Sequence, residues 1–256
     1  VDLVKEQLPE VSADNILAEP IHRNTAPSMA WANHRISMMN PNACIIATPS
    51  DQAIFNEEAF RENVLEGLAF VAENNHFLTM GVKPTRPEPG YGYIQMGDVC
   101  SDNIYHVQSF TEKPERDFAK VFVESGEFYW NTGLFLSNVS YLRECFCKIL
   151  PPVLRDYDNK YPEFSVETEN AYMKESFSSY PNISVDFGIL EKPSNVCVMR
   201  CDFGWADLGT WHSIYEAMQK GEDDNVIVDS DVLMENCYNT VVKVPKGKLA
   251  VLNGLD

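Results

Sequence analysis

Short apolar runs and longer amphipathic stretches alternate along most of the chain. The runs at 42–47, 77–82 and 196–201 are almost continuously apolar, which is typical of strands covered on both faces. Residues 56–74 place an apolar side chain every three or four positions, which predicts a long helix with one buried face. Strands that alternate with helices predict an α/β fold with a mixed, mainly parallel sheet and helices on both faces.

The later part of the chain changes character. Segments 91–96 and 104–110 alternate between apolar and polar residues, as exposed strands do. The last thirty or so residues are short β segments with glycine turns, so we expect one α/β domain over 1–220 and the start of a small β appendage over 221–256. The chain opens in a helical pattern with neither a cap nor a methionine, which predicts a fragment of a longer chain.

The charge balance restricts the class of ligand. With 38 acidic and 20 basic side chains, the formal net charge is −18. Such a surface repels nucleic acid, so a phosphate-backbone binder is not expected. Solubility alone would explain the acidity, whereas a small anionic ligand would need a divalent cation or a few local lysines and arginines. No apolar run approaches the roughly 20 residues of a membrane span, and no secretory signal opens the chain, so we expect a cytoplasmic protein without a membrane partner.

The seven cysteines show no metal-binding spacing. No pair has CxxC spacing, and no histidine follows at a matching interval, so a zinc site is not expected. We interpret the cysteines as reduced thiols in a cytoplasmic protein.

Two aspartates follow predicted strands at positions suited to ligand chemistry. Asp51 comes after the run at 42–47, and Asp207 comes after the run at 196–201 in a glycine-containing loop. Strand ends of this kind line the ligand crevice of α/β proteins. Mg²⁺ is usually held by one or two carboxylates together with substrate phosphates, so a magnesium site is one interpretation. The alternative is that both aspartates only cap turns.

Candidate phosphate-binding cations occur at three places. Lys113 and Lys192 each lie in a Glu-Lys-Pro triplet after an apolar segment, and Arg23 lies in a polar loop beside Asn24 and Thr25. In an acidic protein these cations are natural partners for a ligand phosphate. Surface lysines that precede a proline-initiated helix are the alternative. The first glycine is Gly67 and no GxGxxG or GxxxxGK loop occurs, so the sequence shown holds no glycine-rich phosphate cradle before that point.

Seven motifs in order carry a resemblance to a known family. They read EPIHRNTAP at 19–27, PSD at 49–51, YGYI at 91–94, FTEKP at 110–114, WNTGLF at 130–135, VDFGILEK at 185–192 and FGWADLGTW at 203–211. Together they resemble the mannose-1-phosphate guanylyltransferases, a branch of the sugar nucleotidyltransferases with a Rossmann-like fold. The resemblance implies that the phosphate of mannose 1-phosphate attacks the α-phosphorus of GTP, which gives GDP-mannose and pyrophosphate. No covalent intermediate is required.

The resemblance also implies roles for individual residues. Asp51 and Asp207 match magnesium-binding aspartates, and Lys113 and Lys192 would hold phosphate oxygens. The catalytic set is then Asp51, Lys113 and Asp207. The positions that match sugar contacts are Glu112, Asn131, Gly133, Asp186 and, through its backbone, Gly92. The positions expected near the nucleotide are Arg23, Asn24 and Thr25.

One departure from the family and two alternatives stay open. The family opens with a strand and a glycine-rich loop that cradles the triphosphate, and neither is present here, so a chain limited to these residues is expected to be inactive or unstable. Another sugar 1-phosphate or base could replace mannose and GTP. The chain could also be a non-catalytic module that binds sugar nucleotides. A short β tail on an acidic fold often forms a subunit contact, which makes a homodimer a further expectation.

Overall fold

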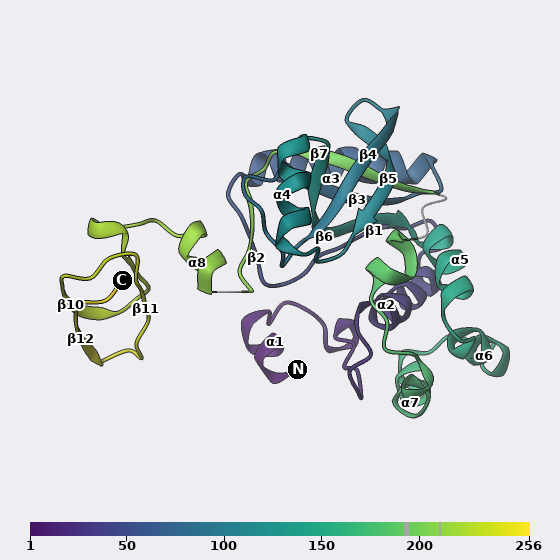
Figure 1. Cartoon of the computed structure of the whole chain (residues 1–256). Coiled ribbons are helices and arrows are strands. Elements are labelled where there is room, and N and C mark those ends of the chain that lie inside the picture. The colour runs from purple at the N-terminus through teal and green to yellow at the C-terminus, as the bar shows by residue number, and fades with distance from the viewer. Residues whose placement is uncertain (192–194, 210) are drawn as a thin grey trace. The chain divides into compact units, whose positions relative to one another are not determined.

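The structure is a computed structural model that describes residues 1–191, 195–209 and 211–256. The chain divides into two compact units (Figure 1). Unit 1 comprises Val1–Thr48 and Arg61–Asp202, and unit 2 comprises Pro49–Phe60 and Phe203–Asp256. Both units are therefore built from segments that are separated in the sequence.

Unit 1 is organised around a six-stranded sheet with the order β1-β6-β3-β7-β5-β4. The strands are β1 (Cys44–Ala47), β3 (Phe77–Val82), β4 (Gly92–Ser101), β5 (Ile104–Thr111), β6 (Phe128–Asn138) and β7 (Val196–Cys201). The apolar runs predicted at 77–82 and 196–201 coincide with β3 and β7. Every residue of β3 is buried, as expected for a strand that is covered on both faces.

The prediction of a mainly parallel sheet is wrong. Among the described strands of this sheet, β3 and β7 pair in parallel, whereas β1–β6, β3–β6, β4–β6, β4–β5 and β5–β7 are antiparallel. Two features cause this. The strands β4 and β5 form a hairpin whose turn contains Asp102 at a positive φ of 22°. The long strand β6 enters antiparallel between β1 and β3. The fold is a mixed α/β fold.

Helices cover both faces of this sheet, as predicted. They are α2 (Thr25–Met39), α3 (Glu57–Glu73), α4 (Arg116–Ser125) and α5 (Val139–Ile149). Two further helices, α6 (Val153–Lys160) and α7 (Val166–Ser176), pack with α2 around the buried Trp31. Side chains alternate along β7, so Val196 and Val198 join the core under α2 and α5, whereas Met199 faces α3. A Cβ on Gly67 of α3 would lie 3.0 Å from the Leu136 side chain, so a glycine there lets the helix lie close to the sheet.

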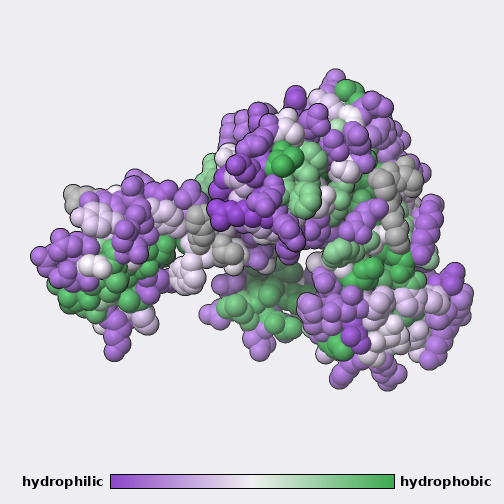
Figure 2. Space-filling model, viewed as in Figure 1, coloured by the Kyte–Doolittle hydropathy of each residue, from purple (hydrophilic) through white to green (hydrophobic). Residues whose placement is uncertain are grey.

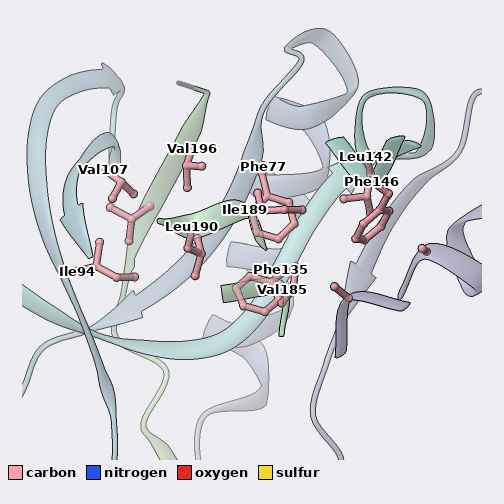
Figure 3. Packing of buried hydrophobic residues seen from close by; sticks show 13 residues of the cluster. Phe77, Ile94, Val107, Phe135, Leu142, Phe146, Val185, Ile189, Leu190 and Val196 are labelled. Carbon is pink, nitrogen blue, oxygen red and sulfur yellow. The ribbon is translucent and has the colours of Figure 1, made fainter. Parts of the chain in front are cut away.

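The core under α2 and α5 joins the sheet to the turn that carries Asp186 (Figure 3). Phe77 and Phe135 stack with ring centroids 5.0 Å apart. Ile189 and Leu190 reach this core from η3 (Asp186–Leu190), a single turn of π-helix. Each fully buried side chain of this size contributes roughly 1.5–3 kcal/mol through the hydrophobic effect, so η3 is firmly anchored.

A buried charge network ties α2 to α6 and α7. Glu169 is fully buried and accepts a hydrogen bond from Arg35 Nε at 2.7 Å, and its other oxygen lies 2.6 Å from His34 Nδ1. The opposite ring nitrogen of His34 lies 2.8 Å from Asp158 Oδ1. Burial raises the pKa of Glu169, but hydrogen bonds from His34 and Arg35 outweigh it and hold that pKa below its ordinary value. Glu169 is therefore a buried carboxylate kept ionised by its partners.

Unit 2 contains short strands and one helix. The strands β2 (Gln52–Ile54) and β8 (Trp205–Asp207) form an antiparallel ribbon, followed by α8 (Trp211–Ala217). Parallel pairs follow, β9 (Val226–Ile227) with β11 (Val241–Val242) and β10 (Asp231–Glu235) with β12 (Leu249–Asn253). Figure 2 shows hydrophobic side chains over β10 and β12, where Leu233, Leu249 and Val251 are exposed. Within the described part of the chain, no helix has the length and apolar character needed to cross a membrane.

Candidate functional site

A polar cluster lies where β4, β5 and β6 run side by side in unit 1. Gly92 on β4 pairs with Asn131 on β6, and Glu112 follows directly after β5. A Cβ on Gly92 would lie 2.7 Å from Glu112 Oε2 and 3.0 Å from the Phe110 ring. No side chain fits there without displacing the carboxylate, so the glycine sets the position of Glu112.

The Asn131 side chain connects three elements of the cluster. Its Oδ1 accepts hydrogen bonds from Thr79 Oγ1 at 2.9 Å and from the Gly133 backbone N–H at 3.3 Å. Its Nδ2 donates to Asp186 Oδ1 at 3.0 Å. Gly133 has a φ of 73°, a left-handed conformation that glycine adopts without strain. These bonds fix which end of the amide faces Asp186.

Asp186 starts η3, and its position is set by the residues that follow it. Gly188, Ile189 and Leu190 are buried. A Cβ on Gly188 would lie 2.6 Å from Ile149 Cδ1, so this turn packs closely against α5. Single π-helical turns are rare and occur often at functional sites. The turn holds the Asp186 carboxylate against Asn131 on a rigid base.

The two carboxyl groups of the cluster resist ionisation. Burial raises the pKa of Glu112, and the Asp186 charge raises it further, whereas Lys113 opposes both. Burial also raises the pKa of Asp186, against hydrogen bonds that include the one from Asn131. Carboxyl groups of this kind, desolvated and beside a like charge, are typical of binding and catalytic sites. They can exchange hydrogen bonds with ligand hydroxyl groups.

Lys113 lies at the rim of the same cluster. Its Nζ is 3.5 Å from Glu112 Oε1, and its side chain is 65% exposed, so the ammonium group is open to a ligand. Its backbone N–H donates to the Tyr91 carbonyl at 3.2 Å. The φ of Lys113 is 48°, a conformation that costs a non-glycine residue free energy and that is found preferentially at functional sites. Lys113 is thus a cation placed for an anionic ligand.

The predicted nucleotide loop is joined to the segment that precedes Asp186. The Asn24 side chain caps α2 by accepting from the Thr25 N–H at 2.9 Å. Thr25 Oγ1 in turn accepts from the Val185 N–H at 2.9 Å. Arg23 donates to the Ser178 carbonyl at 2.9 Å. All three side chains thus have partners within the chain, and their contact with a nucleotide stays a prediction.

The two predicted magnesium ligands come from the ribbon of unit 2. Gln52 pairs with Asp207, and the Leu208 N–H donates to the Asp51 carbonyl at 2.9 Å, so Asp51 and Asp207 lie on neighbouring strands. Asp207 Oδ1 accepts from the Gly209 N–H at 3.0 Å. The turn-capping interpretation therefore holds for one oxygen of Asp207. Among the described residues, no hydrogen bond to its other oxygen is found.

The carboxylate oxygens of Asp51 and Asp207 are of a donor type that suits Mg²⁺. Two carboxylates supply hard oxygen ligands, and Mg²⁺ commonly completes its octahedron with waters and substrate phosphates. A Cβ on Gly209 would lie 3.2 Å from Asp207 Oδ1, so a glycine there leaves the carboxylate accessible. The predicted phosphate ligand Lys192 lies outside the residues that the structure describes.

Comparison with known proteins identifies the family. The sequence model described as nucleotidyl transferase matches residues 2–224. The chain belongs to the nucleotidyl transferase family. It is 33% identical over 258 residues to a mannose-1-phosphate guanylyltransferase of Sinorhizobium fredii (strain NBRC 101917 / NGR234), with 99% of this chain and 50% of the relative covered. It is 31% identical over 264 residues to one of Escherichia coli, with 99% and 56% covered. The resemblance drawn from the motifs is confirmed.

A solved structure agrees with this placement in the nucleotidyl transferase family. It is a crystal structure from Thermus thermophilus, described as a mannose-1-phosphate geranyltransferase, with a TM-score of 0.81 and 25% identity. The match covers 99% of this chain and 71% of that one. The chain spans about half the length of the curated relatives that it matches.

One residue of the candidate site escaped the sequence reasoning. Thr79 is fully buried and orients Asn131, yet no motif includes it. A signal was present, because Thr79 is the one hydroxyl residue in the otherwise apolar run at 77–82. A polar side chain in a strand that is buried on both faces needs a hydrogen-bond partner, and here that partner is the Asn131 side chain of the candidate site.

Proposed function

We propose that this nucleotidyl transferase moves GMP from GTP to mannose 1-phosphate, giving GDP-mannose and pyrophosphate. The observation that carries the proposal is the pairing of Gln52 with Asp207, which brings two motif carboxylates onto neighbouring strands. The names of the curated relatives support the choice of sugar and nucleotide.

Charge neutralisation and alignment carry most of the catalysis in nucleotidyl transfer. In the proposal, Asp51 and Asp207 hold Mg²⁺, which when bound would neutralise charge on the reacting phosphates. The ammonium group of Lys113 binds a phosphate oxygen, which its 65% exposure permits. Lys192 has the same role in the proposal.

Sugar recognition is assigned to the polar cluster of unit 1. Glu112 and Asp186 exchange hydrogen bonds with sugar hydroxyls, and Asn131 orients Asp186. Gly92 lets its backbone approach the sugar and sets the position of Glu112, and Gly133 contributes its backbone. A carboxylate–hydroxyl hydrogen bond in a desolvated site contributes about 1.5–3 kcal/mol, enough to select among sugars.

Nucleotide recognition is assigned to Arg23, Asn24 and Thr25 at the start of α2. A cytoplasmic homodimer completes the proposal. The seven cysteines are free thiols, which fits a reducing compartment. Size-exclusion chromatography with light scattering tests the dimer.

The decisive experiment changes Asp207→Asn in the full-length protein. Pyrophosphate release is measured with mannose 1-phosphate and GTP over a range of Mg²⁺ concentrations. We expect a loss of about 100-fold or more, since a metal ligand is removed while the shape is kept. The control is Asp202→Asn, an exposed carboxylate in the same stretch, which should keep full activity. Turnover that survives Asp207→Asn would overturn the assignment.

Two comparisons separate the alternatives. Replacing GTP by ATP or UTP, and mannose 1-phosphate by other sugar 1-phosphates, tests the substrates. Calorimetric titration of GDP-mannose tests for a non-catalytic binding module. Binding without turnover in the full-length wild type would favour that module over an enzyme.

A further inference from the structure

Four potential metal ligands meet on the sheet of unit 1, away from the residues considered so far. They are His76, Cys100, His106 and Cys197, each offering one ligand atom, and these atoms all lie within 4.8 Å of one another. Two thiols and two imidazoles form the ligand set of many structural zinc sites.

The order of the strands explains why these side chains meet. Neighbouring strands β3, β7, β5 and β4 each bring one of them, with His76 directly before β3. His106 and Cys197 are direct partners across β5 and β7. Leu78 is the partner of Cys197 across β3 and β7, and His76, two residues before Leu78, lies on the same side of its strand. Cys100 lies in a part of β4 where the register with β5 is irregular.

The spacing of the ligand atoms is close to that of a tetrahedral site. Cys197 Sγ lies 3.7 Å from His106 Nδ1. With Zn–S of about 2.3 Å and Zn–N of about 2.0 Å, ligand atoms in a tetrahedral site are about 3.3–3.8 Å apart. Side-chain rotation alone therefore has to draw the most distant atoms together by about 1–1.5 Å.

The surroundings of His76, within the described part of the chain, leave a ring nitrogen of this residue without a partner. Among the described residues, the buried Nδ1 of His76 has no hydrogen-bond partner, which leaves an unsatisfied polar atom beside the other three. Burial and the neighbouring His106 lower the pKa of His76. His106 is exposed, which gives an ion a path from solvent.

The Cys197 thiol is buried beside Cys100. Burial, together with the neighbouring Cys100, raises the pKa of Cys197. A coordinating cation reverses this, because metal binding deprotonates a thiol outright. Binding would therefore release the Cys197 proton to solvent.

We infer that His76, Cys100, His106 and Cys197 form a Cys2His2 site for Zn²⁺ that fastens strands β3, β7, β5 and β4 together. Four protein ligands close the coordination sphere, so the site is structural, unlike the oxygen ligands assigned to Mg²⁺. The sequence expectation that no zinc site exists rested on local spacing. Spacing does not reveal a site whose ligands come from four separate strands.

The test uses the reduced full-length protein after chelator treatment, titrated with Co²⁺ and then Zn²⁺. We expect a thiolate-to-cobalt charge-transfer band and tetrahedral visible bands at one equivalent. Zn²⁺ should abolish both and raise Tm. Cys100→Ser and His106→Asn change the more accessible ligands, so both variants should fold. Each variant should either lose the charge-transfer band or bind Co²⁺ with an affinity that is changed tenfold or more. The control Cys147→Ser changes an exposed cysteine outside the cluster and should leave the titration unchanged.

Three results would overturn the inference. One is the absence of a thiolate–cobalt band in the reduced wild type. Another is a band that persists unchanged in both Cys100→Ser and His106→Asn. The third is a disulfide between Cys100 and Cys197 in protein isolated without oxidant, found by mass spectrometry. Asp207→Asn should keep the cobalt band, which separates this site from the magnesium ligands.

Discussion

The position of Glu112 rests on the absence of a side chain at Gly92, and Gly92→Ala tests this directly. The new Cβ would lie 2.7 Å from Glu112 Oε2, whereas ordinary contact begins at 3.4 Å. The carboxylate must therefore move by at least about 0.7 Å, and the Phe110 ring, 3.0 Å away, must also give. A misplacement of about 1 Å can cost up to 100-fold in rate, so we expect kcat/KM for mannose 1-phosphate to fall about 10- to 100-fold.

Stability should change much less than activity in Gly92→Ala. The atom 2.7 Å from the new Cβ is Glu112 Oε2, the far end of a flexible side chain, which can move at little cost in free energy. The contact with the Phe110 ring should destabilise the fold by about 1–3 kcal/mol through overpacking. For a chain of this size, that corresponds to a fall in Tm of roughly 2–10 °C. Pyrophosphate-release kinetics and thermal unfolding on the same preparation measure the two effects separately.

A second variant shows whether the effect passes through Glu112. If it does, Glu112→Gln and the double change Gly92→Ala/Glu112→Gln should have similar kcat/KM values, because the displaced group no longer contributes. Gly97→Ala lies on the same strand, where a Cβ would meet the His106 carbonyl at 3.2 Å, and serves as the control. The reasoning fails if Gly92→Ala keeps wild-type kcat/KM, or if Gly97→Ala loses as much.

Three further outcomes follow from the structure. Glu169→Ala leaves the buried Arg35 without its partner and should lower the free energy of unfolding by about 3–5 kcal/mol, measured by urea denaturation, while the exposed Glu175→Ala in the same helix should change it little. Because the pKa of Glu169 is lowered, the carboxylate should stabilise the fold above pH 4.5, the ordinary pKa of a glutamate, and this effect should disappear as pH falls through the lowered pKa. A difference in the free energy of unfolding between wild type and variant that persists in acid would contradict this. Burial raises the pKa of Asp186 from 3.8, so the contribution of this carboxyl group to the free energy of unfolding is lost as pH rises through the raised pKa. Asp186→Asn should therefore raise Tm at pH 7, and this gain should shrink in acid. The same change should weaken binding of mannose 1-phosphate. Gly126 ends α4 with φ 73° and open space around it, so Gly126→Ala should cost only the backbone penalty of about 1–2 kcal/mol, and a larger loss would point to a contact absent here.

The hydrophobic pattern predicts the strands of unit 1 better than their pairing. The run at 77–82 is β3 and the run at 196–201 is β7, because a strand covered on both faces needs an unbroken apolar sequence. Whether two neighbouring strands pair in parallel or antiparallel depends instead on the order of the strands in the sheet. The place of β6 between β1 and β3 is a property of the assembled sheet, and no local sequence signal carries it.

The candidate site, like the fold, could be predicted from the sequence only in part. The spacing of Asp51 and Asp207 after apolar runs indicated two carboxylates at strand ends, and the ribbon brings them onto neighbouring strands. No local pattern indicated that Thr79 would orient Asn131 from another strand, or that histidines and cysteines of four strands would meet. Contacts across a sheet are set by register, which one strand alone does not encode.

The discontinuous make-up of unit 2 has a consequence for the protein as it leaves the ribosome. The strand β2 finds its partner β8 only after the whole sheet of unit 1 has been synthesised, since β8 follows β7 in the chain. At about 5–20 residues per second, β2 waits roughly 8–30 s for that partner. The strand β7, which lies between β3 and β5, ends at Cys201 shortly before β8, so for most of this interval the sheet of unit 1 is as incomplete as the ribbon. A ribosome that stalls before Val196 would therefore carry a chain without β7 and β8, which can complete neither the sheet nor the ribbon of the predicted magnesium ligands.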